Sequence, residues 1–256
     1  MENKERMFHI GLTKSDIEGA KYAILPGDPG RVSKIARMLD RYAPLAVNRE
    51  FTSYLGEIYG NKVLVISTGI GGPSAAICVE ELHLLGIETI IRVGTCGGMQ
   101  QNVNSGDLII ASGAIRMEGT TKEYAPIEFP AVANLDVVNA LVQACKNLGQ
   151  SYTVGVTQSK DSFYGQHRPE TLPNGDELLR KWKAWLALDC KASEMESAAL
   201  FIVGQYLRVR VGSCFLVVAT QERAKAGLDN PQVHDTDGAI RVAVEAMKIL
   251  IDADKQ

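Results

Sequence analysis

The stretch that decides the fold is residues 62–85, KVLVISTGIGGPSAAICVEELHLL. It begins with an apolar run of strand length, passes through a loop of glycines and one proline, and continues as a helical pattern that Gly86 ends. Glycine permits a tight turn, and proline is favoured in the first turn of a helix. A strand followed at once by a helix is the unit from which parallel sheets are built.

Outward from this unit, short apolar runs alternate with helical patterns along the chain. The predicted strands are 22–26, 62–68, 89–93, 108–112, 153–157 and 211–220, and the predicted helices are 32–39, 74–85, 135–148, 193–206 and 238–252. This alternation predicts an α/β fold with a largely parallel sheet. The stretch 159–192 is polar and less regular, and is interpreted as an insertion. No repeat or linker divides the chain, so residues 1–256 are expected to form one domain.

Composition excludes several classes of protein. The net charge is −3 and no block of like charge occurs, which argues against nucleic acid or an anionic membrane as partner. The first residues, Met-Glu-Asn-Lys-Glu-Arg, lead into no secretory signal, and no apolar run approaches the roughly 20 residues of a membrane helix. Five cysteines without a C-x-x-C pair argue against disulfides or zinc, so a cytoplasmic location is expected. Cys96, in a glycine-rich loop, is kept as an alternative nucleophile.

Three predicted strands end in unusual loops, and ligands of open α/β sheets gather beyond such strand ends. In the loop 25–31, LPGDPGR, Asp28 is a good helix N-cap and Pro29 a good first helical residue. Free backbone N–H groups would then form an anion site, to which Arg31 adds a forked donor. The alternative is an ordinary turn with a solvated arginine. In the loop 68–74, glycines again permit a tight turn and Pro73 opens the next predicted helix.

The third strand end holds Arg92 within the apolar run 89–93, followed by the loop 94–98. A buried charge is costly unless it is paired. Its partner is either an internal carboxylate or an anionic ligand, and arginine suits phosphate because its fork matches two oxygens. Thr95 could add a hydroxyl to the same anion. Taken alone, the pair Arg49 and Glu50 is typical of a solvated surface.

Six motifs together resemble a known family. Gly-Asp-Pro-Gly-Arg (27–31), Asn-Arg-Glu-Phe-Thr (48–52), Ser-Thr-Gly-Ile-Gly-Gly-Pro-Ser (67–74), Arg-Val-Gly-Thr (92–95) and Glu-Met-Glu-Ser-Ala (194–198) are similar to the nucleoside phosphorylase superfamily. Phe-Tyr-Gly-Gln-His-Arg (163–168) resembles its uridine phosphorylases. The match runs in order over nearly the whole chain. The resemblance implies a three-layer α/β/α domain, assembled as dimers within a homo-hexamer.

The resemblance also implies roles for individual residues. The phosphate-binding set would be Gly27, Arg31, Arg49, Arg92 and Thr95. The nucleoside-binding set would be His9, Thr95, Phe163, Gln166, Arg168, Met195 and Glu196. Arg92, Gln166, Arg168 and Glu196 would carry the chemistry, while His9 and Arg49 would serve the neighbouring subunit's site. Inorganic phosphate would be the co-substrate, without an organic cofactor, and Glu50 and Ser74 match positions where some relatives bind a monovalent cation such as K⁺.

The expected base contacts follow from hydrogen-bonding groups. A glutamine amide such as that of Gln166 matches uracil O2 and N3–H, and the guanidinium of Arg168, which only donates, matches O4. Cytosine presents an amino group there and would be rejected. The base loop lacks a proline that uridine phosphorylases often carry, and 217–223 replaces a usual Asn-Arg, which leaves the role of Arg223 open. The alternatives are a purine nucleoside phosphorylase, although 217–223 holds no aspartate, and a non-catalytic nucleoside-binding or storage relative.

Overall fold

The structure is a computed structural model that describes residues 6–255. Residues 1–5 and 256 lie outside the described part, and with them most of the N-terminal segment in which no secretory signal is predicted. The strands within the described part are β1 (Tyr22–Pro26), β2 (Tyr42–Asn48), β3 (Phe51–Ile58), β4 (Asn61–Ile66), β5 (Thr89–Gly98), β6 (Leu108–Met117), β7 (Ala131–Val132), β8 (Tyr152–Lys160), β9 (Ala192–Glu194) and β10 (Arg210–Thr220). They form one sheet in the order β10-β6-β8-β9-β5-β1-β4-β3-β2, with β7 beside β6.

The centre of the sheet is parallel. Strands β4, β1, β5 and β10 run in the same direction, and β8 is parallel to β6 and to β9. Antiparallel pairings join β2, β3 and β4 at one edge, and β10 to β6. Because β9 pairs with both β8 and β5, and β10 with both β5 and β6, these five strands close into a ring. The sheet is therefore mixed, as predicted, and its ring brings the ends of β5, β8 and β9 together.

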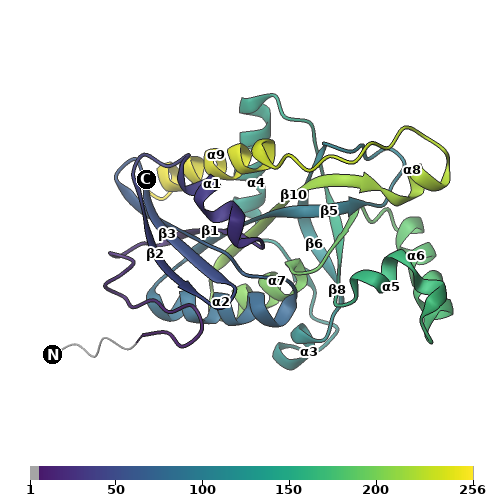
Figure 1. Ribbon diagram of the computed structural model, residues 1–256, viewed down its shortest axis with the longest axis horizontal. Helices are drawn as coiled ribbons and strands as arrows, with labels where there is room; N and C mark the ends of the chain where they lie inside the picture. The colour runs from purple at the N-terminus through teal and green to yellow at the C-terminus, as the bar shows by residue number, and fades with distance from the viewer. Residues whose placement is uncertain (1–5, 256) are drawn as a thin grey trace.

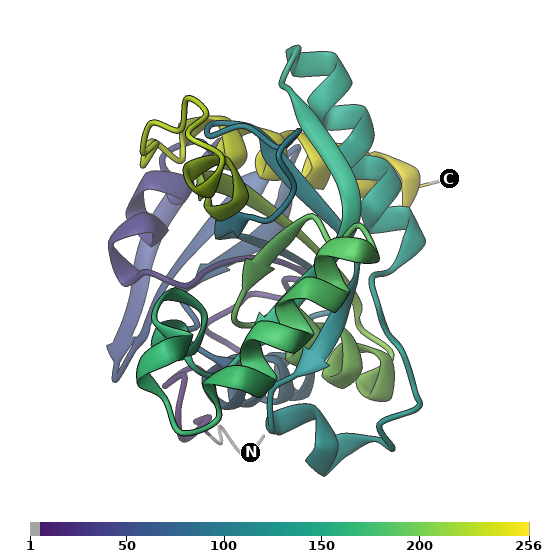
Figure 2. The same ribbon diagram turned by 90° about the vertical axis from the view of Figure 1, so that its right-hand side faces the viewer.

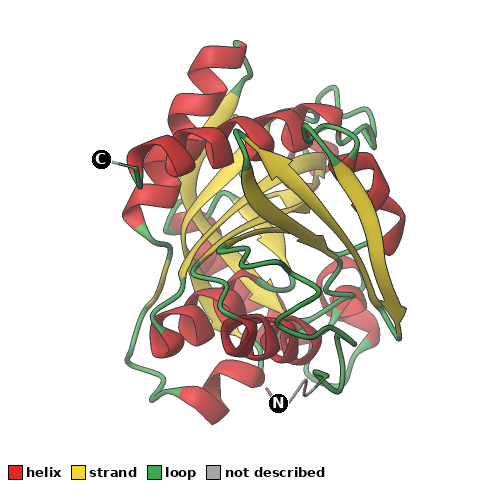
Figure 3. Ribbon diagram, turned by 90° about the vertical axis from the view of Figure 1, so that its left-hand side faces the viewer, coloured by secondary structure: helices red, strands yellow, loops and turns green. Residues whose placement is uncertain are grey.

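Helices cover both faces of the sheet (Figures 1 and 3). Those described are α1 (Val32–Ala36), α2 (Gly72–Leu85), α3 (Thr120–Tyr124), α4 (Leu135–Leu148), α5 (Phe163–His167), α6 (Gly175–Ala187), α7 (Ser197–Leu207), α8 (Gln221–Lys225) and α9 (Asp237–Ala253), with 3-10 turns η1 (Pro29–Arg31) and η2 (Pro169–Thr171). α1, α4 and α9 pack on one face, and α2, α3 and α7 lie on the other (Figure 1). The three-layer α/β/α arrangement is confirmed.

Successive residues of a central strand point alternately into two hydrophobic cores, one on each face of the sheet. Ala23 and Leu25 of β1 enter the core under α2 and α7, whereas Tyr22 and Ile24 enter the core under α4 and α9. A strand buried on both faces is continuously apolar, which is why the central strands were visible in the sequence. Gly86 and Gly149 end α2 and α4 in the left-handed conformation that glycine adopts at low cost. Among residues 6–255, no helix combines the length and the apolar character needed to cross a membrane.

Several predicted boundaries were wrong. The predicted helix 32–39 stops at Ala36, and the predicted strands 89–93 and 108–112 extend to Gly98 and Met117. The predicted helix 193–206 begins only at Ser197, because residues 192–194 pair as β9 with β5 and β8. The polar stretch 159–192 contains α5, η2 and α6, which together cover one end of the molecule (Figure 2). The edge strand β2 and its neighbour β3 were not predicted.

Candidate functional site

A buried ion pair lies at the centre of the candidate site. Arg92 on β5 is 4% exposed, and its Nη2 lies 2.9 Å from Oε2 of Glu196, in the turn before α7. Its Nη1 donates to Oγ1 of Thr68 at 2.6 Å. Oε1 of Glu196 accepts from the backbone N–H of Gly71 at 2.8 Å, at the start of α2. The internal carboxylate partner considered for Arg92 is thus Glu196, which also satisfies the positive N-terminus of α2.

Arg92 nevertheless retains an unused donor. Among the described residues, its buried Nε has no hydrogen-bond partner. Such orphaned donors are rare in native proteins and usually mark an absent ligand or water. Gly27 packs directly against this guanidinium, because a Cβ placed there would lie 2.9 Å from Arg92 Nη2.

A second guanidinium stands nearby. Arg31 ends η1, and burial lowers its pKa; Asp28 opposes this effect, and the positive charge of Arg92 adds to it. Two guanidinium groups close enough to disfavour each other's charge are stabilised by an anion between them. Gly27 packs on the Arg92 guanidinium and Arg31 lies in the turn that follows Gly27, so these residues have the chemistry that suits an oxyanion.

The loop 25–31 does not present the free helix N-terminus that the sequence predicted. Asp28 does cap the turn, and its Oδ1 accepts from the N–H of Gly30 at 2.8 Å. That N–H is therefore occupied, and the helical segments that follow, η1 and α1, contain only three and five residues. The Gly30 N–H is therefore not available to a ligand, and Arg31 and the close approach of the backbone at Gly27 are the features of this loop that suit an anion.

Glu194 is a functional residue that the sequence reasoning missed. It is 3% exposed at the end of β9, and its Oε2 accepts from the backbone N–H groups of Glu196 and Ser197, both at 2.8 Å. Its Oε1 accepts from Ser159 and from Thr157. Glu194 therefore caps α7 and fixes the turn that carries Glu196. The signal is the repeated acidic residue in Glu-Met-Glu-Ser (194–197), which the sequence placed in the first turn of the predicted helix 193–206.

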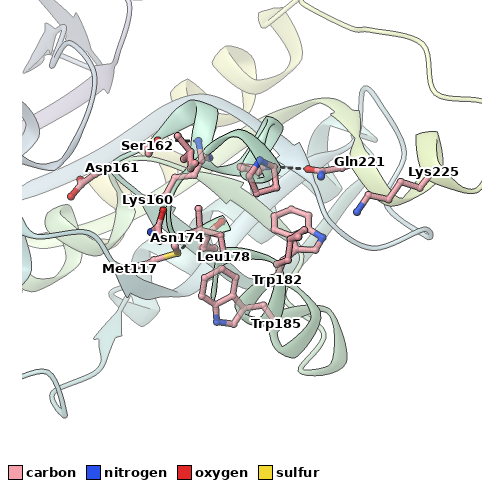
Figure 4. Close-up of a pocket in the computed structure, with 16 residues that line it drawn as sticks. Met117, Lys160, Asp161, Ser162, Asn174, Leu178, Trp182, Trp185, Gln221 and Lys225 are labelled. Carbon is pink, nitrogen blue, oxygen red and sulfur yellow. Dashed lines mark hydrogen bonds between the residues drawn. The ribbon is translucent and has the colours of Figure 1, made fainter. Parts of the chain in front are cut away.

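A pocket opens beside this turn, between β8, α5, α6 and α8 (Figure 4). Its lining is polar on the strand side and apolar on the α6 side, where Trp182 and Trp185 stand (Figure 4). The residues used below are Lys160, Gln166, Trp182, Trp185 and Gln221. A largely apolar cavity with a few convergent polar groups is typical of a small-molecule site.

Gln166 links this pocket to the ion pair. Its Oε1 lies 2.7 Å from Oγ of Ser193, and its Nε2 donates to Oε1 of Gln221 at 3.3 Å. A Cβ on Gly97, in the same strand as Arg92, would lie 3.6 Å from Gln166 Nε2. Ser193 and Glu196 are three positions apart in one segment. The amide of Gln166 therefore contacts the segment that carries Glu196 and lies beside the strand that carries Arg92.

Two predicted base contacts do not line this pocket. Phe163 is 52% exposed and packs on the ring of His167, with centroids 4.4 Å apart. Arg168 is exposed, and its Cζ lies 4.7 Å from the centre of the Tyr164 ring. The structure therefore does not bring Arg168 beside Gln166.

The question left open for Arg223 is answered by its contacts. Its Nε donates to the carbonyl of Asp229 at 2.9 Å and its Nη1 to the carbonyl of Gln101 at 2.7 Å, at an exposed position. The polar side chain that enters the pocket from the end of β10 is instead Gln221. The guanidinium of Arg223 is thus held by two backbone carbonyls and does not line the pocket.

His9 and Arg49 lie together on the outer surface. Nδ1 of His9 is 2.7 Å from Oε1 of Glu81, and the His9 carbonyl accepts from Nδ2 of Asn48 at 2.7 Å. The Arg49 guanidinium is exposed over the ring of Phe8, 5.6 Å from its centre. Both residues predicted to serve a neighbour thus share one exposed patch.

The remaining predicted residues, Thr95, Met195, Glu50 and Ser74, do not line the pocket. Thr95 and Met195 are partly buried, in β5 and in the turn before α7. Glu50 accepts from Oγ of Ser74 at 2.7 Å, and this hydrogen bond lowers the pKa of its carboxyl. Within residues 6–255, no group of three or more His, Cys, Asp and Glu side chains gathers to hold a metal. Cys96 is buried, and burial raises the pKa of its thiol, so it is not an activated nucleophile.

Known proteins match this sequence over nearly its full length. Residues 21–253 match the family described as the Phosphorylase superfamily. The uridine phosphorylase of Treponema pallidum (strain Nichols) is 54% identical over 247 residues, which cover 96% of this chain and 95% of that protein. The uridine phosphorylase of Escherichia coli K12 is 41% identical, over 97% of this chain and 100% of that protein. The guanosine phosphorylase of Halorubrum lacusprofundi is 35% identical, over 94% and 98%. This chain therefore belongs to the phosphorylase superfamily.

Proposed function

We propose that this chain is a uridine phosphorylase, which uses inorganic phosphate to split uridine into uracil and ribose 1-phosphate. The observation that carries the proposal is the buried Nε of Arg92, which has no partner among the described residues and lies on β5, the strand whose Gly97 faces the amide of Gln166 in the pocket. The matching relatives at 54% and 41% identity are named uridine phosphorylases, which supports the same substrate.

The reaction requires an anion, an oriented sugar and a stabilised leaving base. Phosphate bound by Arg92, Arg31 and the backbone at Gly27 forms a bond to C1′ of the ribose while the bond from C1′ to N1 of uracil breaks. The electron pair of that bond leaves on uracil, which then takes a proton from water. The phosphate also stabilises the positive charge that develops on the sugar. Glu196, held by Arg92 and Gly71, accepts from the ribose hydroxyls and sets the angle of attack.

Base recognition starts at Gln166. Oε1 has a second lone pair for uracil N3–H, and Nε2 has a second proton for a uracil carbonyl. Arg168 remains a proposed partner of O4; because its guanidinium lies over Tyr164, this role requires the segment 163–168 to move toward the pocket.

The assembly and its location form part of the proposal. His9 and Arg49 act in the site of a neighbouring subunit, within a homo-hexamer built from dimers. This assignment is supported by their common exposed patch. Glu50 and Ser74 supply oxygens to a monovalent cation, such as K⁺, at a subunit boundary, supported by their contact at 2.7 Å. The enzyme acts in the cytoplasm.

A substrate panel tests the proposal. Ultraviolet absorbance is followed for uridine, thymidine, cytidine and inosine, each with and without phosphate. We expect phosphate-dependent cleavage of uridine and little cleavage of cytidine or inosine. Preferred cleavage of inosine would instead identify a purine nucleoside phosphorylase, and binding without turnover of any nucleoside would identify a binding relative.

A further inference from the structure

Lys160 is a buried cation that the proposed mechanism has not used. It ends β8, is 5% exposed, and lines the same pocket as Gln166 (Figure 4). Its Nζ donates to Oγ of Ser193 at 2.7 Å and to the carbonyl of Glu194 at 3.5 Å. Within the described part of the chain, no carboxylate oxygen lies within 4 Å of this ammonium group. An ammonium has three donors, so the pocket contains a positive charge whose hydrogen-bonding capacity is not exhausted.

The burial of this charge is unfavourable in the absence of a ligand. Burial lowers the pKa of Lys160 to about 8, opposed by the negative charges of Glu194 and Glu196. The other titratable groups around it are Cys96 on β5 and His167 on α5; burial lowers the pKa of His167, and Lys160 adds to the effect. Asp161, the next residue in the chain, is turned away and accepts from the N–H of Gly119. A lysine whose charged form is disfavoured by burial is typical of a site where negative charge develops during the reaction.

Ser193 connects the lysine to the base-reading amide. Its hydroxyl lies 2.7 Å from Lys160 Nζ, 2.6 Å from Gln158 Oε1 and 2.7 Å from Gln166 Oε1. An ammonium only donates, so Ser193 accepts from Lys160 and has one proton to give. The oxygens of Gln158 and Gln166 compete for that proton. It goes to Gln166 when the Gln158 amide is turned so that its N–H₂ faces Ser193, and Gln166 then presents both an acceptor and a donor to uracil. Donation by a cation polarises the hydroxyl and strengthens its own donation to the amide.

On this basis we propose that Lys160 is a positioning and charge-stabilising residue for the departing base, acting through Ser193 on Gln166. This inference rests on the proposed uridine phosphorolysis and deepens it. As the bond to N1 breaks, negative charge spreads over the uracil ring, and the chain from Lys160 through Ser193 to Gln166 stabilises it. Lys160 supplies a positive charge from inside the pocket. The guanidinium of Arg168 lies over the Tyr164 ring and does not supply one there in this structure.

Leaving-group dependence provides the test. kcat and KM are measured at pH 6.5 for uridine and for 5-fluorouridine, whose base leaves more easily, in wild type, Lys160→Met, Lys160→Arg and the exposed control Lys183→Met. We expect Lys160→Met to lower kcat for uridine by about 100-fold, the order seen when one preorganised donor is removed. The loss for 5-fluorouridine should be several-fold smaller. KM for phosphate should stay unchanged, and Lys183→Met should behave as wild type.

The pH profile gives a second, independent measurement. The active form carries the charged lysine, so kcat of the wild type should fall as pH rises through about 8. This limb should be absent in Lys160→Met and move to higher pH in Lys160→Arg, whose guanidinium stays charged. Ionisation of uridine itself affects all variants alike. Circular dichroism establishes that each variant is folded.

The outcomes separate the two proposals. If the wild type cleaves uridine with phosphate but folded Lys160→Met keeps its kcat, or loses equally with both nucleosides, only the role of Lys160 is rejected. If the wild type does not cleave uridine at all, the proposed function is rejected, and the role of Lys160 with it.

Discussion

At the scale of single residues, Gly27 shows how closely the backbone approaches the guanidinium of Arg92. Nothing larger than hydrogen fits, since a Cβ would lie 2.9 Å from Arg92 Nη2 and 3.1 Å from the Gly69 carbonyl. Neither neighbour yields easily, because Arg92 is held by Glu196 and the carbonyl belongs to the backbone. The glycine is therefore required by the position of a charge, and not by a positive φ.

Gly27→Ala should move the Arg92 guanidinium while leaving the sheet intact. We expect kcat/KM for phosphate to fall by about 100-fold, the order of loss for a misplacement near 1 Å. Steady-state kinetics with varied phosphate measure this. The matched control is Gly119→Ala, where an added Cβ meets its nearest atom at an ordinary 3.6 Å. Equal phosphate kinetics in the two variants would show that Gly27 does not position Arg92.

The residue types of the site were readable from the sequence, but their geometry was not. Arg92 was conspicuous because a charge interrupts an apolar strand, and the structure confirms that it is buried and paired. Lys160 was missed because it occupies a polar stretch, where lysine is ordinary until tertiary packing buries it. Arg168 was assigned to the base by the resemblance and by its donor chemistry, and neither specifies that its guanidinium lies over Tyr164.

At the scale of elements, β9 shows why local pattern fails at short segments. Its three residues lie before a strongly helical run, yet they pair with β5 and β8 because the ring of strands requires them there. The long central strands and the capped helices α2 and α4 were predicted because burial on both faces and terminal glycines leave local signals. The edge strand β2 and its neighbour β3, whose residues have mixed exposure, leave weak local signals.

The cap at the start of α7 makes an element-level prediction. Replacing Glu194 by glutamine removes the negative charge and leaves one oxygen to accept, where the carboxylate accepts from two backbone N–H groups and two hydroxyls. Glu194→Gln should therefore lower the free energy of unfolding by about 1–3 kcal/mol, as for lost hydrogen bonds to a buried charged group. Urea denaturation measures it. Glu177→Gln, in an exposed pair with Lys181 on α6, should leave stability unchanged. Equal stability of both variants would contradict the capping role.

Helix α6 carries a spectroscopic reporter of the pocket. The two tryptophans of the chain, Trp182 and Trp185, both line it. Binding of uracil together with ribose 1-phosphate should change the emission excited at 295 nm, because the ring environment becomes drier and charged groups shift. Trp182→Phe should retain a smaller change. An emission spectrum that saturating uracil leaves unaltered would place the base elsewhere.

At the scale of the whole molecule, one three-layer domain holds the Arg92–Glu196 ion pair and the pocket containing Gln166, while His9 and Arg49 lie on an outer patch. A site completed by a neighbour predicts complementation between inactive subunits. Arg49→Ala and Arg92→Lys subunits, each of low activity, should regain activity when unfolded and refolded together, because some mixed pairs contain an intact site. Mixed activity equal to the average of the separate variants would show that each subunit works alone.

Phosphorus-31 NMR of uridine incubated with the enzyme and inorganic phosphate tests the central claim most directly. The account predicts that the phosphate resonance declines as a ribose 1-phosphate resonance grows, in equal amounts with released uracil, and that no uracil appears without phosphate. Release of uracil with free ribose, at a rate independent of phosphate, would contradict it.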